Sequence, residues 1–394
     1  MRKISVIIFL ISLFFLSPTA SHAQETKDII GITQDAGYQI DPITKPKASI
    51  VVNASNGDIL WQDNMMAVRD PASMSKMFTL YLLFEDIDKG KLDLDTTIRA
   101  TETDQAISQI YEISNNKIVA GVNYPVSDLI TMTAVPSSNA ATIMLANYLS
   151  ENNASAFIDR INKTAEKLGM SNTHFNNASG AVAEAFNGYY TPDKYDASAP
   201  NQTTAHDLAI LAYNFLKKYP DILSFTNQST VKTMIGTPYE EEFHSYNYSL
   251  PGDKYGLKGV DGLKTGSSPS AAFNAMVTAQ RDGQRLITIV MGVGDWSDQE
   301  GEFYRHPYIN ALTEKGFEDI NKTSKTKFDN LFPKEKKITE ADESRSSSVK
   351  VKKPSEPGFL SRFEAFVDHH HGIFFIGLGI FIVIVIILAL VAIL

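Results

Sequence analysis

Ser73 and Lys76 stand one helical turn apart in the segment PASMSKMFTLYLLF, residues 71–84. Apolar residues follow them at three- and four-residue spacing, and Pro71 suits a first turn, so the segment predicts a helix that starts near the serine. On such a helix the amine of Lys76 lies on the same face as the hydroxyl of Ser73. A serine beside a deprotonated lysine is a nucleophile with its base, the pair that acyl transfer requires.

The Ser-x-x-Lys spacing has little weight alone, because it recurs at Ser114/Lys117, Ser229/Lys232, Ser324/Lys327 and Ser347/Lys350. Only Ser73 opens a strongly apolar helix, where free backbone N–H groups and the helix dipole favour developing negative charge. A lysine base must also lose its proton near neutral pH. Burial beside a second cation would lower its pKa in the required direction.

The segment VDGLKTGSS, residues 260–268, offers a candidate for the second cation, since it predicts a strand that presents Lys264, Thr265 and Gly266. A glycine at this place would let a substrate backbone approach closely. A surface strand that ends in a turn explains the same residues without any chemistry.

A third polar group lies in VPSSNAATIMLANYL, residues 135–149, where Ser137 and Asn139 stand just before or at the start of a predicted helix. Serine and asparagine are also the residues that a helix N-cap prefers. Capping is therefore a sufficient explanation for them until other evidence is added.

The elements that must position these residues form a mixed pattern. Residues 47–62 predict two strands around Asn56-Gly57, and residues 271–293 predict two more around Asp282-Gly283, both strong hairpin signals. Residues 91–220 are mostly helical in pattern, and residues 306–322 predict a closing helix. An antiparallel sheet shared by both ends of the domain, flanked by helices and interrupted by an all-helical insert, is an α+β architecture.

Both ends of the chain predict export and anchoring. Residues 1–23 combine Arg2 and Lys3, an apolar run and small residues at a cleavage position, which is typical of a secretory signal. Residues 372–394 carry no charge and are long enough to cross a bilayer. We therefore expect a domain over 24–322, a polar linker over 323–371 and a transmembrane anchor, with the domain outside the cell membrane.

Composition excludes several classes of function. The chain has no cysteine, so disulfides, thiol catalysis and thiolate metal sites are absent. The formal net charge of −9 and the lack of a recognition motif make nucleic acid an unexpected partner. The histidines show no metal-binding spacing, and we expect neither a metal nor a cofactor.

The order Ser-x-x-Lys, Ser-x-Asn and Lys-Thr-Gly resembles that of the penicillin-recognising active-site-serine enzymes. The segments AEKLGMSNTHFNNASG (165–180) and TTAHDLA (203–209) narrow the resemblance. They look like those of low-molecular-mass penicillin-binding proteins of the D-alanyl-D-alanine carboxypeptidase family, peptidase family S11, especially the membrane-anchored Gram-positive members. The resemblance runs from about Lys47 to Lys322 and implies a β-lactamase/transpeptidase-like fold.

The resemblance also implies roles in acyl transfer. Ser73 would attack the carbonyl between the two terminal D-alanines of a peptidoglycan stem peptide, and Lys76 would take its proton. Backbone N–H groups of Ser73 and Ser267 would bind the oxyanion. Ser137, hydrogen-bonded to Lys76 and Lys264, would protonate the leaving D-alanine.

Substrate binding is implied for the remaining motif residues. Asn139 would bind the substrate amide, while Lys264 and Thr265, followed by Gly266, would hold the terminal carboxylate. Attack by water would shorten the peptide, and attack by an amine would cross-link it. A β-lactam would leave a slow acyl-enzyme on Ser73.

The sequence departs from the family pattern at two places. His206 stands where many members are taken to have an arginine that helps anchor the substrate carboxylate, so this anchoring is expected to be weaker or pH-dependent unless His206 is simply a neutral structural residue. Residues 323–371 are too short and polar for the small β-rich domain that members often carry before the membrane.

Two alternatives remain at this stage. A β-lactamase would share the fold and the three motifs, but it needs a second base, usually a glutamate in a loop after Ser-x-Asn, and no convincing Glu-x-x-x-Asn loop is present. A non-catalytic module that captures wall peptides or antibiotics would have no need for the nucleophile and the base.

Overall fold

The computed structural model describes residues 27–298, 300–322 and 328–332. The predicted signal peptide, transmembrane anchor and most of the predicted linker lie outside these ranges. Within them, no helix has the length and apolarity needed to cross a membrane. Residues 328–332 were expected in the linker, but Asp329–Asn330 forms strand β10 on the edge of the sheet and Leu331 is fully buried.

The centre of the domain is a six-stranded sheet in the order β10-β2-β1-β9-β8-β7, in which every neighbouring pair is antiparallel. Its strands are β1 (Ala48–Asn53), β2 (Asp58–Asp63), β7 (Val260–Ser268), β8 (Ala272–Arg281), β9 (Gln284–Val293) and β10. The two predicted hairpins are confirmed as β1–β2 and β8–β9. Asp282 and Gly283 both take positive φ angles, 48° and 78°, as a tight hairpin turn requires.

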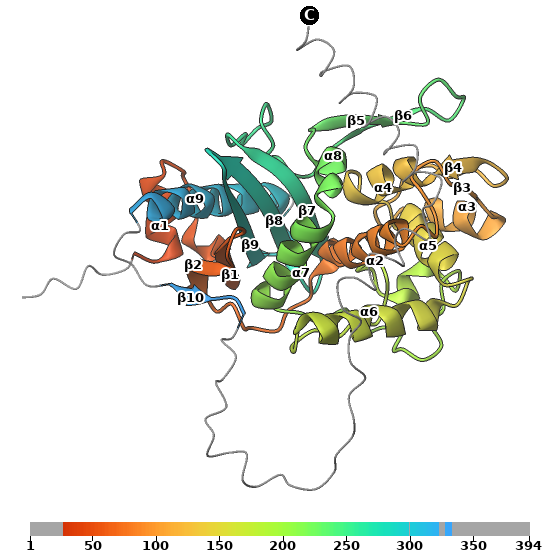
Figure 1. The fold of residues 1–394 in the computed structure, drawn as a ribbon, viewed down its shortest axis with the longest axis horizontal. Helices are drawn as coiled ribbons and strands as arrows, with labels where there is room; N and C mark the ends of the chain where they lie inside the picture. Colours follow the sequence, from red (N-terminus) through yellow and green to blue (C-terminus); the bar gives the residue numbers. More distant parts are fainter. Residues whose placement is uncertain (1–26, 299, 323–327, 333–394) are drawn as a thin grey trace, which may run out of the picture. The chain divides into compact units, whose positions relative to one another are not determined.

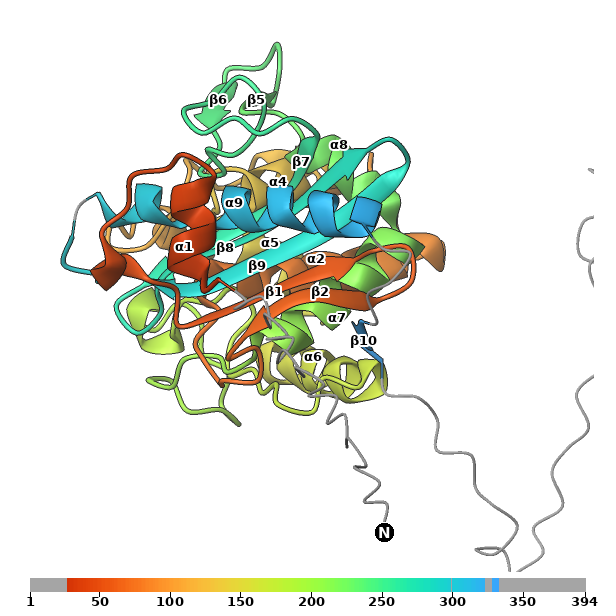
Figure 2. The same cartoon turned by 90° about the vertical axis from the view of Figure 1, so that its left-hand side faces the viewer.

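Helices cover both faces of this sheet (Figures 1 and 2). Helix α9 (Gly301–Lys322) lies across one face together with α1 (Ile29–Asp35), and α7 (Ala205–Lys218) packs on the other. Strand side chains alternate accordingly, since Val51 packs in the α9 core and Ile50 in the opposite core. The predicted closing helix at 306–322 is present and begins five residues earlier, at Gly301.

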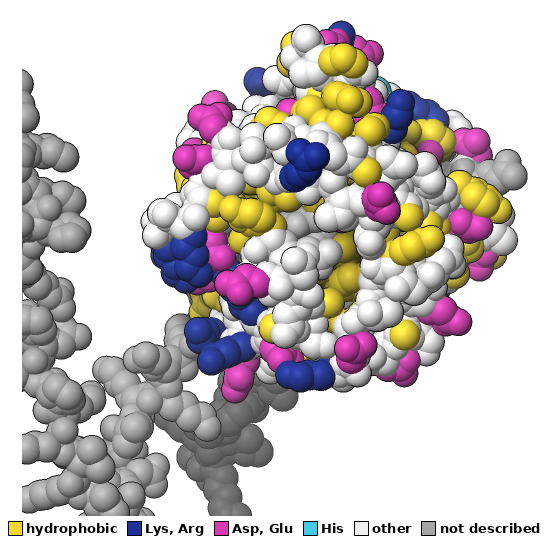
Figure 3. All heavy atoms as spheres, turned by 90° about the vertical axis from the view of Figure 1, so that its right-hand side faces the viewer, with side chains coloured by type: hydrophobic (Ala, Val, Ile, Leu, Met, Phe, Trp, Pro, Cys, Tyr) yellow, Lys and Arg dark blue, Asp and Glu magenta, His cyan; other side chains and the backbone are white. Residues whose placement is uncertain are grey.

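The insert between β2 and β7 is mainly helical, as predicted. It contains α2 (Lys76–Asp88), α3 (Glu102–Ser108), α4 (Val126–Ala134), α5 (Asn139–Leu149), α6 (Ala154–Leu168), α7 and α8 (Leu223–Thr226). Two small two-stranded sheets were not predicted: β3 (Thr97–Arg99) with β4 (Asn123–Pro125), and β5 (Thr230–Thr233) with β6 (Glu241–His244). The β5–β6 hairpin projects at the top of Figure 3, where hydrophobic side chains gather, and Ile235 at its tip is 71% exposed.

Strand β7 is the sheet edge that borders the 3-10 turn Ala72–Ser75, which leads into α2. Gly266 makes this contact. A Cβ atom on Gly266 would lie 2.5 Å from the carbonyl oxygen of Pro71 and 3.0 Å from the backbone nitrogen of Ser73. The sequence suggested that this glycine admits a substrate backbone, but its hydrogen faces the protein's own turn. Glycine is required here because any side chain would force the strand away from Ser73.

Replacing Gly266 with alanine should therefore disturb both stability and the site. We expect the free energy of unfolding to fall by about 2 kcal/mol or more, as for other overpacked contacts, and reactivity at Ser73 to fall with it. Urea unfolding measures the first effect. Gly31→Ala on α1 is the matched control, because its nearest neighbour would be 3.5 Å away; equal stability of the two variants would contradict this account.

Candidate active site

Ser73 lies in the 3-10 turn, and Lys76 is the first residue of α2. The Lys76 side chain is completely buried, and its Nζ is 3.0 Å from Ser73 Oγ, 2.9 Å from Asn139 Oδ1 and 2.9 Å from the Ser179 carbonyl oxygen. Burial first, and then repulsion from Lys264, holds the pKa of Lys76 well below its ordinary value.

These contacts determine which way the Ser73 hydroxyl proton points. A neutral amine has two N–H groups and one lone pair. Asn139 Oδ1 and the Ser179 carbonyl can only accept hydrogen bonds, so a neutral Lys76 donates to both of them. Its lone pair is then left for the Ser73 hydroxyl. The geometry is that of a nucleophile with a general base in place.

Two of the other Ser-x-x-Lys pairs, Ser114/Lys117 and Ser229/Lys232, lie in the described part of the chain, and neither has this geometry. Lys232 lies on strand β5, exposed and paired with Glu240, so it does not share a helical face with Ser229. Ser114 does line the pocket, but Lys117 is exposed. The pairs at Ser324 and Ser347 lie outside the described residues.

Asn139 is held rigidly at the start of α5. Its backbone nitrogen and its Nδ2 both donate to the Ser114 carbonyl, at 2.8 and 2.9 Å, which leaves Oδ1 for Lys76. The cap of this helix is Ser138, whose hydroxyl accepts from Ala141 N. Capping therefore does not explain Ser137 or Asn139.

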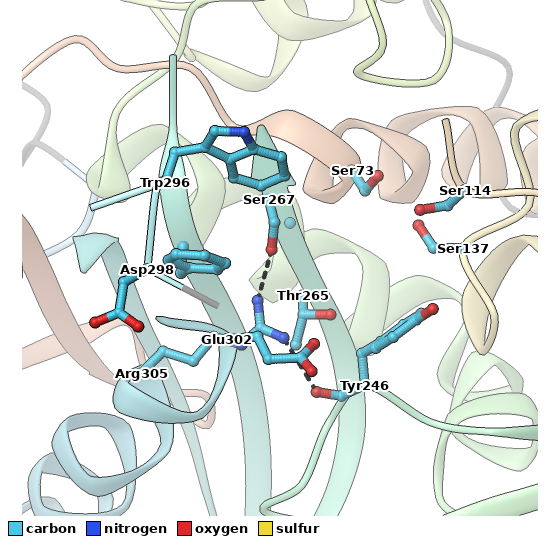
Figure 4. A pocket seen from close by; sticks show the side chains of 12 residues that line it. Ser73, Ser114, Ser137, Tyr246, Thr265, Ser267, Trp296, Asp298, Glu302 and Arg305 are labelled. Carbon is cyan, nitrogen blue, oxygen red and sulfur yellow. Dashed lines mark hydrogen bonds between the residues drawn. The ribbon is translucent and has the colours of Figure 1, made fainter. Parts of the chain in front are cut away.

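Ser137 precedes the cap and takes a positive φ of 62°, which is uncommon for a serine. It is only 4% exposed, yet its hydroxyl has no hydrogen-bond partner among the described residues. The expected hydrogen bonds to Lys76 and Lys264 are not formed, since both amines donate elsewhere. The hydroxyl instead lines the pocket beside Ser73 and Ser114 (Figure 4).

The opposite wall comes from β7. Lys264 is buried, and its Nζ donates to the Thr265 carbonyl at 3.2 Å. Desolvation, with repulsion from Arg305, lowers the pKa of Lys264 to about 7. Thr265, Gly266 and Ser267 line the same pocket as Ser73. The three sequence motifs therefore meet at one place, as the sequence predicted.

Arg305 is a site residue that sequence reasoning missed. It projects from α9, is fully buried, and donates from Nη1 to Ser267 Oγ at 2.9 Å and to the Asn274 carbonyl at 3.3 Å. Burial lowers its pKa to about 10, against the opposing effect of Glu302. The predicted closing helix began at His306, one residue too late to include it; an arginine at the start of an apolar helix was the available signal.

Ser73, Ser137, Thr265 and Arg305 open onto a pocket of about 300 Å³, which two acidic residues, Asp298 and Glu302, also line. The buried lysines Lys76 and Lys264 are not among the lining residues. Lys76, Lys264 and Arg305 are all buried, and none forms an ion pair with an acidic side chain in the described ranges. Repulsion among them is relieved when an amine loses its proton or when an anion binds. Trp296, stacked on Phe273 at 5.6 Å between ring centroids, forms an aromatic wall at the pocket's rim (Figure 4).

His206 is not part of this pocket. Its Nε2 lies 3.2 Å from the Leu331 carbonyl and its Nδ1 lies 3.2 Å from Asp207 Oδ1, beside strand β10. The expectation that His206 weakens carboxylate anchoring is therefore not supported by its position. The arginine available to an anion is Arg305, which comes from another element.

Comparison with known proteins agrees with this geometry. The profile of the peptidase S11 family, described as D-alanyl-D-alanine carboxypeptidase, matches residues 37–295. The chain belongs to this family. It is 27% identical over 74% of its length to D-alanyl-D-alanine carboxypeptidase DacF of Bacillus subtilis, and the match spans 66% of that relative. For DacA of Escherichia coli the identity is 25%, over 66% of this chain and 59% of the relative.

Solved structures share the fold of this family member. A peptidoglycan synthesis regulatory factor from Streptococcus pneumoniae superposes with a TM-score of 0.63 at 28% identity, covering 69% of this chain and 73% of that one. Penicillin-binding protein D2 from Listeria monocytogenes, in its ampicillin-bound form, gives a TM-score of 0.56 at 28% identity and covers 71% of this chain and all of that one. The predicted family and the transpeptidase-like fold of the domain are thus confirmed, whereas the predicted C-terminal transmembrane helix lies outside the described residues.

The lowered pKa of Lys264 makes stability depend on pH. Between about 7 and its ordinary value of 10.5, the unfolded chain binds a proton that the folded protein lacks, so this group makes stability rise with pH. Its destabilising effect is complete below pH 7 and vanishes above 10.5. We expect Lys264→Gln to reduce the rise in the free energy of unfolding between these limits.

Urea unfolding over this pH range measures the effect. Lys258→Gln, which removes an exposed lysine, is the matched control and should leave the rise unchanged. An unchanged rise in Lys264→Gln would show that Lys264 is not desolvated in the folded protein.

Proposed function

We propose that this protein is a serine-type D-alanyl-D-alanine carboxypeptidase that acts on peptidoglycan stem peptides. The observation that carries the proposal is the contact of a buried Lys76 amine, whose pKa is lowered, with the Oγ of Ser73, a residue that lines the pocket. Membership of the S11 family and the names of its relatives support the same reaction.

The reaction begins with attack of Ser73 Oγ on the carbonyl carbon between the two terminal D-alanines, while Lys76 takes the hydroxyl proton. The negative charge that develops on the carbonyl oxygen is bound by the backbone N–H groups of Ser73 and Ser267. Gly266 supports this assignment, because its lack of a side chain brings β7 against the Ser73 turn. The C–N bond then breaks to give the acyl-enzyme.

The leaving D-alanine needs a proton on its nitrogen. We assign its delivery to Ser137, whose hydroxyl then regains a proton from the Lys76 ammonium, so that Lys76 ends the step neutral. The Ser137 hydroxyl is buried in the pocket and has no partner among the described residues. The terminal carboxylate is bound by Thr265 and by the cations of Lys264 and Arg305, which relieves their mutual repulsion. Asn139 orients Lys76. The substrate-amide contact that the resemblance implied for Asn139 is not part of this proposal, because its Nδ2 already donates to the Ser114 carbonyl.

The acyl-enzyme is released by one of two acceptors. Water gives a peptide shortened by one D-alanine, and an amine gives a cross-link, which would be D,D-transpeptidation. Relatives with ampicillin- and cefotaxime-bound structures support β-lactams as ligands that acylate Ser73.

A slow β-lactam acyl-enzyme is favoured over β-lactamase activity by the segment 168–180. It contains no aspartate or glutamate, and it offers the Ser179 carbonyl to Lys76 and the Ala178 carbonyl to Thr79. This segment therefore supplies no carboxylate that could act as a second base for deacylation. A non-catalytic binder is disfavoured, since it has no use for a neutral lysine in contact with Ser73.

The test of this function is acylation and turnover by the full-length chain. We expect benzylpenicillin to give a persistent adduct that maps to Ser73, and diacetyl-lysyl-D-alanyl-D-alanine to release D-alanine. Intact mass, peptide digestion and a D-alanine assay measure these outcomes. Ser73→Ala should abolish both, whereas Ser229→Ala, which removes the serine of another Ser-x-x-Lys pair, should leave both unchanged.

Other outcomes would identify the alternatives. Rapid drug hydrolysis without a lasting adduct would indicate a β-lactamase. Drug or peptide binding without any reaction would indicate a non-catalytic binding module, and turnover by Ser73→Ala would show that the nucleophile lies elsewhere.

We also propose that the protein is exported and held at the outer face of the cytoplasmic membrane by residues 372–394. The proposal rests on the sequence of the two ends. A chain that ends at residue 371 should leave the membrane fraction and keep its β-lactam reactivity, as fractionation with labelled penicillin would show. Retention of the shortened chain in the membrane would contradict the anchor.

A further inference from the structure

Asp70 lies just before the nucleophile turn and connects it to the sheet. Asp70 is buried, with only 8% of its surface exposed. Its Oδ1 accepts from the Ala72 N–H at 2.7 Å, and its Oδ2 accepts from the hydroxyls of Ser268 at 2.7 Å and Ser270 at 2.5 Å. One carboxylate thus joins the turn that carries Ser73 to the end of β7 and the start of the β7–β8 turn.

The backbone of Asp70 is fixed as well. Its carbonyl accepts from Asn274 Nδ2 at 3.0 Å, and Asn274 Oδ1 accepts from the Gly292 N–H at 2.8 Å. Asn274 is completely buried on β8, next to β9. Asp70 is therefore hydrogen-bonded to β7, to the β7–β8 turn and to β8. Because Ser73 follows Asp70 by only three residues, these bonds also restrain the nucleophile turn.

The turn needs such a restraint because its backbone is strained. Ala72 has a φ of 47°, a region that residues with a Cβ rarely adopt, and it is 1% exposed. The Asp70 carboxylate bonds the N–H of this same residue. Holding Ala72 in place also fixes the direction of the next peptide N–H, which belongs to Ser73.

The second contact acts on the other wall of the pocket. Ser268, bonded to Asp70, directly follows Ser267, whose N–H is proposed to bind the oxyanion. The N–H groups of Ser73 and Ser267, which must both face the oxyanion, thus belong to separate segments. The Asp70 carboxylate bonds the residue next to each of them, Ala72 and Ser268. Donors in such a pair must be placed accurately, since they act on charge that exists only in the transition state.

We propose that Asp70 is a positioning residue that sets the separation of the Ser73 and Ser267 N–H groups. The inference rests on the proposed acyl transfer at Ser73. Asp70 does not line the pocket and does not contact substrate; it acts through the two segments that it joins.

The experiment measures acylation of the full-length chain by benzylpenicillin over a range of concentrations, so that the rate constant at saturation is separated from the binding constant. Asp70→Ala removes all three side-chain hydrogen bonds. Ser268→Ala with Ser270→Ala removes the two bonds from Asp70 to β7 and its turn, together with the bond from the Ala271 N–H to Ser268 Oγ, and keeps the bond to Ala72. Because oxyanion donors act in the transition state, we expect both variants to lose at least about 10-fold in the saturating rate constant, with the binding constant changed less than about 3-fold.

Asp70→Asn provides the rescue. Its Oδ1 still accepts from Ala72 N–H, and its amide can donate to the serine hydroxyls, which can turn to accept. We expect it to recover most of the acylation rate. Asp86→Ala is the matched control, since Asp86 is a buried acid bonded to Arg160 near the far end of α2. It should lower stability and leave the rate constant per folded molecule unchanged.

The proposal fails if the serine double variant, or folded Asp70→Ala, acylates within about 3-fold of the unchanged chain. It also fails if Asp86→Ala loses rate to the same extent, because the effect would then be general destabilisation. If Asp70→Ala does not fold, the serine double variant decides alone. Absence of any acylation in the unchanged chain would instead disprove the proposed function, so the two failures are distinguishable.

Discussion

The Lys76 amine is removed from water and lies 3.0 Å from the hydroxyl of Ser73, with two carbonyl oxygens as its other partners. An ammonium ion in this place would lack an acidic counter-ion among the described residues, and it would be repelled by Lys264. Loss of its proton removes that cost. Burial of Lys76 makes its charged form unfavourable, and this effect gives the neutral amine that a general base requires.

The same electrostatic constraint acts on two other buried cations of the site. Lys264 and Arg305 are buried with lowered pKa values for the same first cause, desolvation. An anion bound beside them would stabilise their charged forms and weaken their repulsion of each other. Because Lys76 donates to Asn139 Oδ1 and the Ser179 carbonyl, it can stay neutral while Lys264 and Arg305 are charged.

The sheet provides the rigidity that this arrangement needs. One of its edges is covered by β10, a strand from the region that was expected to be a linker, and the other edge, β7, borders the nucleophile turn. The distance between β7 and the nucleophile turn is limited by the contact of Gly266 with backbone atoms of that turn, so packing determines this distance. Positive φ angles at Ala72 and Ser137, on the two sides of the nucleophile, show that the surrounding structure holds both segments in unusual conformations.

Local signals predicted many elements well. The Asn56-Gly57 and Asp282-Gly283 hairpins, the helix that follows Ser73 and the helix that begins at Asn139 all depend on residues close together in the chain. The short β3–β4 and β5–β6 pairs were missed because each depends on partners across a long loop or an irregular hairpin, with little alternation to reveal them.

The sequence by itself determined the pairing of Ser73 with Lys76 and the order of the motifs, because a helix places residues three positions apart on one face and the family motifs follow each other in that order. Only the tertiary structure decided which other residues lie beside this pair and which hydrogen bonds they form. It put Arg305, and not His206, at the pocket, left the Ser137 hydroxyl without its expected lysine bonds, and turned Gly266 toward the Ser73 turn. These outcomes depend on contacts between segments tens to hundreds of residues apart, and no local pattern encodes the distances at which such segments pack.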